Sequence, residues 1–229
     1  MPASGDVVPV GDAAVLAVLG ETADDTVTRR VWAVTASLRA ALGASILDLA
    51  PAFASVLVRF DPSVARLATV MACVRGVLES ATVATETPSR LVDVNVCFDP
   101  EFGLDLADIA RHAKMTAAEV VAEFCRPEYH VAFLGFTAGF PYLLGLPKVF
   151  ELPRLPTPRV RVPAGSVALA AGQCGIYPRS SPGGWHILGK TNAEVFDPAR
   201  ETAALFSPGD RVRFHSVASL SDATASVSA

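Results

Sequence analysis

The chain has 229 residues, of which 51% are apolar, and a formal net charge of −4, so it can bury a core in one large domain or two small ones. A negative charge argues against binding to nucleic acid or to an anionic membrane, because either needs a basic face. No apolar run approaches the roughly 20 residues that span a bilayer. Residues 1–10 contain no Lys or Arg, which argues against a secretory signal. We therefore expect a cytoplasmic protein.

The cysteines and histidines predict neither disulfides nor a metal site. The four cysteines are widely spaced and none forms a CxxC pair, and the four histidines are equally scattered. Without an export signal, free thiols are favoured over disulfides.

The first 90 or so residues alternate between strand and helix patterns. Residues 13–19 form an apolar run typical of a strand. Apolar residues then recur at three- and four-residue steps from Val27 to Ala41, which places them on one helical face, and Gly43 follows as a terminator.

Two strands, a helix and a further strand complete this pattern. The strands are predicted at 45–49 and 55–60, and the pair Asp61-Pro62 is a typical start for a second helix. Residues 91–98 alternate between apolar and polar side chains, as in a half-buried strand. The order β-α-β-β-α-β is that of the ferredoxin-like motif.

The second half of the chain has a different texture. Thr116 and Glu119 have the spacing of a capping box and predict a helix start. After Tyr129 glycines and prolines become frequent, and short strands such as 166–170, 185–188 and 211–217 suggest a compact barrel or sandwich. The Ser/Ala-rich residues 219–229 are expected to form a disordered tail.

A loop rich in glycine and aromatic residues, GFTAGFPYLLGLP, covers residues 135–147. Its glycines permit close backbone approach, so the loop suits a ligand or a partner chain. Alternatively, Phe136, Phe140 and Tyr142 plug the barrel. If Phe136, Phe140 and residues 143–146 form an exposed apolar patch, a subunit interface is the natural explanation.

A proline-rich stretch, PRLPTPRVRVP, presents Arg154, Arg159 and Arg161 from residues 153–163. Guanidinium groups on a stiff backbone suit a carboxylate or a phosphate, because little entropy is lost on binding. The alternative is a solvated basic strand whose exposed ion pairs contribute little.

Residues 175–191, GIYPRSSPGGWHILGKT, contain the densest set of polar side chains. The serines and glycines of 180–184 can offer hydroxyl and backbone N–H groups to an anion, and His186 and Lys190 are titratable. The spacing is not that of a Walker A motif, and Ser-Pro-Gly-Gly is also simply a good turn.

Taken with VNVCFDPEFGLDL and the final PGDRVRF, these motifs resemble the small-subunit family that includes the B-type subunit of 5-oxoprolinase, allophanate hydrolase subunit 1 and the Kip-type sporulation kinase inhibitor. The resemblance runs from about residue 10 to 215. It implies an α+β fold, with a ferredoxin-like α/β domain over residues 1–88, a cyclophilin-like β-barrel over 89–218, and the tail at 219–229.

The resemblance also implies partners and a cofactor. Members act with a larger homologous subunit, which resembles allophanate hydrolase subunit 2 or the C-type subunit of oxoprolinase. The bacterial oxoprolinase has a third subunit and uses ATP. The expected function is ATP-dependent cleavage of 5-oxoproline to glutamate, in which phosphorylation of the lactam oxygen makes a better electrophile. The alternatives are an allophanate hydrolase or urea amidolyase-type subunit, and a regulatory module that inhibits a sensor histidine kinase.

Residue type and motif position together suggest roles within this site. The predicted catalytic residues are His186 for proton transfer, Arg159 for the phosphate or carboxylate, and Ser181 for an oxyanion. The predicted substrate- or anion-binding residues are Arg161, Ser166, Tyr177, Gly183, Gly184, Lys190 and Thr191. The predicted partner loop comprises Phe136, Gly139, Phe140 and Tyr142. Three positions depart from the family pattern: Phe124 stands for His, Ala138 for Pro and Lys190 for Arg.

Overall fold

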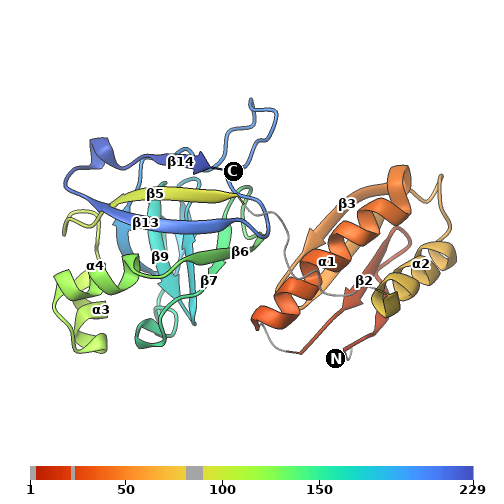
Figure 1. Cartoon of the computed structure of the whole chain (residues 1–229), viewed down its shortest axis with the longest axis horizontal. Helices are drawn as coiled ribbons and strands as arrows, with labels where there is room; N and C mark the ends of the chain where they lie inside the picture. Colours follow the sequence, from red (N-terminus) through yellow and green to blue (C-terminus); the bar gives the residue numbers. More distant parts are fainter. Residues whose placement is uncertain (1–3, 22–23, 81–89, 229) are drawn as a thin grey trace. The chain divides into compact units, whose positions relative to one another are not determined.

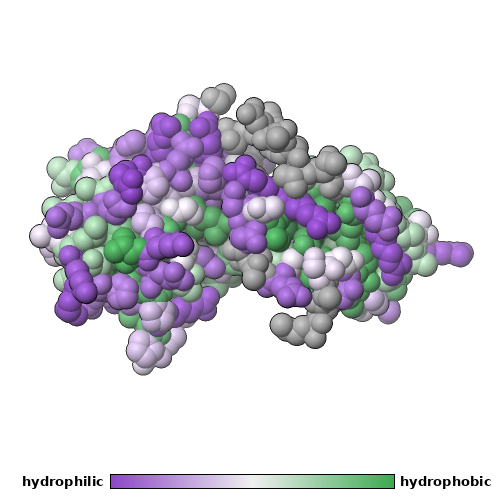
Figure 2. All heavy atoms as spheres, turned by 60° about the horizontal axis from the view of Figure 1, so that its bottom comes forward, coloured by the Kyte–Doolittle hydropathy of each residue, from purple (hydrophilic) through white to green (hydrophobic). Residues whose placement is uncertain are grey.

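The chain divides between residues 87 and 88 into two units with separate cores, the red-to-orange part and the yellow-to-blue part of Figure 1. The computed structural model describes residues 4–21, 24–80 and 90–228. Within these residues, no helix is long and apolar enough to cross a bilayer. On the face seen in Figure 2, apolar and polar residues are interspersed over both units.

The N-terminal unit is a four-stranded antiparallel sheet with two helices. In spatial order its strands are β1 (Val7–Pro9), β2 (Ala14–Val18), β4 (Ser55–Phe60) and β3 (Ile46–Pro51), and its helices are α1 (Asp25–Leu42) and α2 (Leu67–Ser80). Helix α1 packs against β3 and β4, and α2 packs against β1 and β2. The apolar side chains between the helices and the sheet form the core of this unit.

Local sequence signals determine where α1 begins and ends. The Asp24 side chain accepts a hydrogen bond from the Val27 N–H, and Gly43 ends the helix at φ 50°, a conformation that glycine adopts without steric cost. The predicted start of α2 at Asp61 is wrong. The Asp61 carboxylate instead accepts hydrogen bonds from the backbone and hydroxyl of Ser63, so this segment forms a turn and the helix begins at Leu67.

The α+β fold class is confirmed, but one strand of the predicted ferredoxin-like order belongs elsewhere. The strand expected at 91–98 is β5 (Leu91–Cys97), which lies in the sheet of the second unit between β13 and β14. The N-terminal sheet has the short strand β1, paired with β2, as its fourth strand instead. Alternation along β5 indicates a buried strand face, but it carries no information about which sheet the strand joins.

The C-terminal unit is the predicted β-barrel. Its strands in sheet order are β12 (His186–Lys190), β9 (Ser166–Ala170), β10 (Gln173–Ile176), β7 (Pro141–Leu144), β6 (Tyr129–Leu134), β13 (Arg211–Val217), β5 and β14 (Ala225–Ser228). Pairing of Lys190 with Cys97 joins β12 to β5 and closes the barrel. A separate ribbon pairs β8 (Arg159–Val162) with β11 (Ser181–Gly183).

Two short helices, α3 (Leu106–Ala113) and α4 (Ala117–Cys125), cover part of the barrel core. The predicted capping box at α4 is confirmed: Thr116 and Glu119 each bond the other's backbone N–H. Phe124 at the end of α4 is fully buried, and its ring lies 4.9 Å from that of Phe214. The position at which the family usually has His is therefore a core position in this chain.

The predicted disordered tail is wrong for the residues that the structure describes. Leu220–Asp222 form a 3-10 turn, and β14 pairs with β5 in the register Ala225↔Val94. The hydroxyl of Thr191 and the amide of Asn192 donate to backbone carbonyls of this segment. Strand pairing uses backbone groups, which a Ser/Ala-rich composition does not reveal.

Candidate functional site

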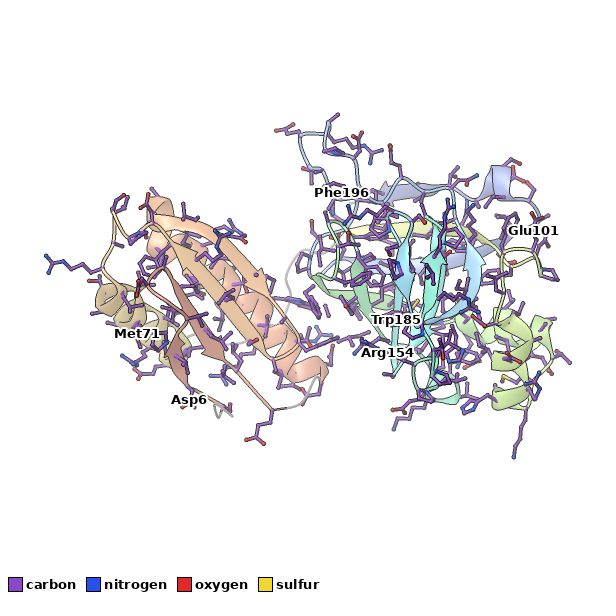
Figure 3. All side chains as sticks on the ribbon, turned by 180° about the vertical axis from the view of Figure 1, so that it is seen from behind. Asp6, Met71, Glu101, Arg154, Trp185 and Phe196 are labelled. Carbon is purple, nitrogen blue, oxygen red and sulfur yellow. The ribbon has the colours of Figure 1, made fainter. Side chains whose placement is uncertain are left out.

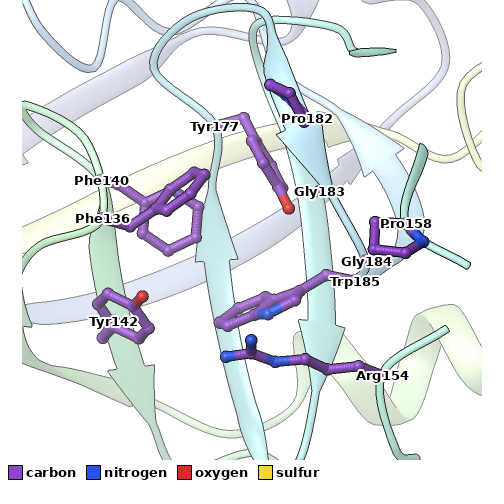
Figure 4. Close-up of a pocket in the computed structure, with 10 residues that line it drawn as sticks. All are labelled: Phe136, Phe140, Tyr142, Arg154, Pro158, Tyr177, Pro182, Gly183, Gly184 and Trp185. Atoms are coloured by element: carbon purple, nitrogen blue, oxygen red, sulfur yellow. The ribbon is translucent and has the colours of Figure 1, made fainter. Parts of the chain in front are cut away.

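A pocket of about 250 Å³ opens on the barrel unit, and aromatic rings form most of its wall (Figure 4). Its lining comes from the 135–147 loop, residues 154 and 158, and the β10–β12 region. The lining residues are Phe136, Phe140, Tyr142, Arg154, Pro158, Tyr177, Pro182, Gly183, Gly184 and Trp185. The pocket therefore combines an apolar wall with one cationic side chain.

The rings of the wall contact one another edge to face. Phe140 lies at their centre, with ring centroids 5.2 Å from Tyr177, 5.5 Å from Trp185 and 5.1 Å from Tyr142. This arrangement directs the positive edge of one ring toward the negative face of another, which fixes the rings in place. These contacts hold the wall in place before any ligand binds, and Phe136 at its side is largely exposed.

Two phenols contribute hydrogen-bonding groups that stay neutral. Burial raises the pKa of Tyr177 and that of Tyr142 above the ordinary value for tyrosine. Gly183 is necessary for this geometry, since a Cβ there would lie 2.3 Å from the Tyr177 hydroxyl oxygen. At neutral pH these phenols can donate a hydrogen bond to a carbonyl oxygen without adding charge.

Residues 153–159, here called the strap, bring Arg154 and Pro158 to the pocket. Two hydrogen bonds fasten the strap to the start of β12 and to Gly184, which precedes it. His186 Nε2 lies 2.9 Å from the Pro153 carbonyl oxygen, and the Leu155 N–H donates to the Gly184 carbonyl at 2.8 Å. Arg154 lies next to Trp185 in both side-chain views (Figures 3 and 4).

Asp105 fastens the far end of the strap. Its carboxylate accepts from Arg159 Nη2 at 2.7 Å and from the Ile187 N–H at 2.7 Å, and its side chain is only 6% exposed. Asp105 stands before α3, yet its carboxylate does not cap that helix. One buried carboxylate therefore joins the strap to β12 at Ile187, two residues after Trp185.

Six of the predicted site residues meet at this pocket. They come from segments that are up to 48 positions apart in the sequence, and the barrel brings them together. They are Phe136, Phe140, Tyr142, Tyr177, Gly183 and Gly184.

Two of the three predicted catalytic residues hold the strap instead of lining the pocket. His186 is buried, bonds the strap through Nε2, and has no partner at Nδ1. Trp185, the residue before β12, lines the pocket, whereas His186, the first residue of β12, does not. Arg159 is bound to Asp105, and its Nη1 is buried without a partner. This geometry gives no support to proton transfer by His186.

Ser181 and the other predicted anion-binding residues are dispersed. Ser181 lies in β11, which pairs with β8, so the expected anion-binding turn runs as a short strand, and the Ser181 hydroxyl is buried without a partner. Arg161 bonds Ser180, and the Lys190 ammonium lies 5.7 Å from the centre of the Phe102 ring. Ser166 and Thr191 are buried, outside the pocket lining. These residues form no phosphate cradle.

The 135–147 loop does not present the broad apolar patch expected of a partner loop. Phe140 and Leu143 are buried, and Gly139 packs so closely that a Cβ would lie 2.6 Å from the Phe196 Cβ. Ala138, which stands in the place of the family's usual Pro, is exposed. Phe136 alone among these aromatic residues is largely exposed.

Sequence reasoning named Arg154 but selected its neighbours Arg159 and Arg161 as functional. The structure places Arg154 in the pocket together with Trp185, Pro158 and Pro182. A signal was present at Trp185, a large aromatic residue between the glycine pair Gly183-Gly184 and the strand β12. No pattern in the proline-rich stretch distinguishes Arg154 from the other two arginines. Within the described residues, no group of three or more His, Cys, Asp or Glu is placed to hold a metal ion.

Comparison with known proteins identifies the sequence family. The model of the carboxyltransferase domain, subdomains C and D, matches residues 6–206. The chain is 35% identical to the B-type subunit of 5-oxoprolinase from Haemophilus influenzae over 216 residues, covering 91% of this chain and 96% of that protein. It is 34% identical to the B-type subunit of the Bacillus subtilis enzyme, with 90% of each chain covered.

Solved structures share the fold. A protein designated TTHA0988 superposes with a TM-score of 0.78 at 36% identity, covering 89% of this chain, and the present chain spans 40% of its length. PH0987 from Pyrococcus horikoshii gives a TM-score of 0.54 at 31% identity, covering 93% and 97% of the two chains. The urea carboxylase of Kluyveromyces lactis, 18% identical with a TM-score of 0.76, shares the fold over 24% of its own length.

Proposed function

Since the chain belongs to the carboxyltransferase-domain family that contains the B-type subunits of 5-oxoprolinase, we propose that it is the small subunit of an ATP-dependent hydrolase that opens 5-oxoproline to glutamate. The observation that carries the proposal is the aromatic pocket with Arg154 at its edge. The expected partners are a larger homologous subunit and a third subunit, and the expected location is the cytoplasm.

The pocket chemistry matches the two halves of 5-oxoproline. The substrate has a flat five-membered lactam ring and a carboxylate. Trp185, Tyr177 and Phe140 line the pocket and give it an apolar wall suited to the lactam, and Arg154 offers a guanidinium to the carboxylate. The neutral phenol of Tyr177 offers a donor to the lactam carbonyl.

The same lining favours a binding role for this subunit, with the chemistry supplied by the assembly. Among the ten described lining residues there is no carboxylate, imidazole or thiol to act as a general base. The predicted anion-binding turn at 181–184 runs largely as strand β11, paired with β8, which gives no support to a phosphate site there. We place nucleotide binding and proton transfer on the partner subunits, and the isolated chain is expected to be inactive.

The proposal is tested by reconstitution. The chain is co-expressed with the larger homologous subunit and the third component, and glutamate formation from 5-oxoproline and ATP is measured. Product that requires every component supports the proposal. A stable complex without product would refute the substrate assignment, and the absence of any complex would favour a regulatory module.

Arg154→Gln, compared with Arg161→Gln, tests the pocket within that assembly. Loss of a charge-assisted hydrogen bond of about 1.5–3 kcal/mol predicts a KM for 5-oxoproline raised by about 10-fold or more in the Arg154 variant. Arg161 lies outside the pocket and bonds Ser180, so its variant serves as the matched control and should leave KM unchanged. Equal KM values for the two variants would reject the pocket as the substrate site.

A further inference from the structure

Phe136 has a backbone conformation that aromatic residues rarely adopt. Its φ is 63°, and the Thr137 N–H donates to the Gly135 carbonyl at 2.7 Å, which closes a three-residue turn around it. This hydrogen bond and a positive φ describe the strained form of the γ-turn. A bulky residue at positive φ is an outlier that the surrounding structure must hold in place.

Hydrogen bonds on both sides hold this turn. The Gly135 N–H donates to the Phe140 carbonyl at 3.1 Å, and the Phe140 N–H donates to the Thr137 carbonyl at 3.0 Å. Gly139 follows at φ 78°, packed against Phe196. The loop is therefore rigid, and glycine at position 136 would satisfy it with less strain.

Phe136 is also unusual in its exposure: it is 61% exposed, whereas the neighbouring Phe140 and Tyr177 are almost fully buried. It contacts Phe140 and Tyr177 edge to face, with ring centroids 5.5 and 6.2 Å away. Figure 4 shows it at the side of the pocket across from Pro158 and Gly184. Folding thus gains little from this ring, while the backbone conformation costs stability.

We propose that Phe136 is an aromatic clamp that determines specificity: its strained turn aims the ring at the pocket so that it covers one face of a bound five-membered lactam. The ligand identity rests on the proposed function, whereas the clamp itself rests on the turn, the exposure and the pocket. Binding buries the exposed part of the ring, so the apolar contact that the free protein lacks forms only with ligand present. Because Phe136 stands at one side of the pocket, its ring also limits the size of the ligand ring that fits.

Backbone strain is tested without any ligand by comparing Phe136→Gly with Phe136→Ala. At ordinary φ, alanine is the more stable of the two, but at positive φ the order reverses. We expect Phe136→Gly to unfold roughly 2–4 °C above Phe136→Ala. Ala171→Gly is the matched control, since Ala171 has φ 51° outside the pocket and should gain stability without any change in binding. A Phe136→Ala variant more stable than Phe136→Gly would overturn the strain argument.

Specificity is tested in the reconstituted complex with 5-oxoproline and its six-membered homologue, 6-oxopiperidine-2-carboxylate. We expect Phe136→Gly to raise KM for 5-oxoproline by about 10-fold with little change in kcat, and to lower the preference for the five-membered ring by about 10-fold. Phe136→Tyr keeps the ring and should restore both values. Unchanged KM and unchanged preference in Phe136→Gly would overturn the clamp.

A wild-type complex inactive on 5-oxoproline would refute the proposed function and leave the clamp to a direct binding measurement. The two lactam carboxylates are then titrated into the purified chain and its Phe136→Gly variant. Weaker binding by the variant supports the clamp. Equal binding, or no binding by the wild-type chain, overturns it.

Discussion

Replacement of Asp105 by alanine tests how the strap is held. The substitution removes two contacts of one carboxylate, the ion pair with Arg159 and the hydrogen bond from the Ile187 N–H, each 2.7 Å long. An unsatisfied buried N–H costs about 1–3 kcal/mol. Breaking a buried ion pair costs about 3–5 kcal/mol, but the Arg159 side chain is 26% exposed and water replaces part of that loss. We expect Asp105→Ala to destabilise the barrel unit by about 3 kcal/mol.

Asp108→Ala, three residues further along in α3, provides the matched control. Asp108 pairs with Arg111 at 2.7 Å, but both side chains are largely exposed, so we expect a loss below about 0.5 kcal/mol. Urea unfolding is followed by the fluorescence of Trp185 in a Trp32→Phe background, since the chain has two tryptophans and Trp32 belongs to the N-terminal unit. A loss below about 1 kcal/mol in Asp105→Ala, or equal losses in both variants, would refute this account of the strap.

Two further predictions concern titration and helix capping. Burial raises the pKa of all three tyrosines, so native tyrosinate absorbance should stay low at pH 10 and rise only at higher pH, while urea-unfolded chain titrates near pH 10. Because the folded pKa values lie above the unfolded ones, stability should be fully present below pH 10 and fall as the pH rises further; a native phenol that titrates at pH 10 or below would contradict the burial. Thr116→Ala removes the capping box of α4 and should cost about 1 kcal/mol in urea unfolding, and an unchanged midpoint would show that the cap contributes nothing.

Signals carried by neighbouring residues were predictable from the sequence. The terminator at Gly43, the capping box at Thr116 and the apolar periodicity of α1 depend on residues within one or two helical turns. Short strands and turns alone did not distinguish a barrel from a sandwich. The family motifs indicated the barrel. The fold class followed from both kinds of information.

Features that depend on distant partners were not predictable. Residues 91–97 alternate equally well for either sheet, and only pairing with β13, about 120 positions away, places them in the barrel. The choice among Arg154, Arg159 and Arg161 depends on Asp105, which binds Arg159 and lies 54 positions before it. His186 was singled out for its chemistry, yet its ring contacts the Pro153 carbonyl 33 positions earlier, outside the pocket that its neighbour Trp185 lines.

The central claim, that the aromatic pocket with Arg154 binds a lactam carboxylate, is tested most directly by titrating L-5-oxoproline into the purified Trp32→Phe chain. Trp185 is then the remaining tryptophan and lies in the pocket wall. We expect a saturable change in its fluorescence, with an affinity about 10-fold lower in Arg154→Gln and unchanged in Arg161→Gln. No change in fluorescence up to millimolar ligand, or equal affinities in the two arginine variants, would contradict the claim.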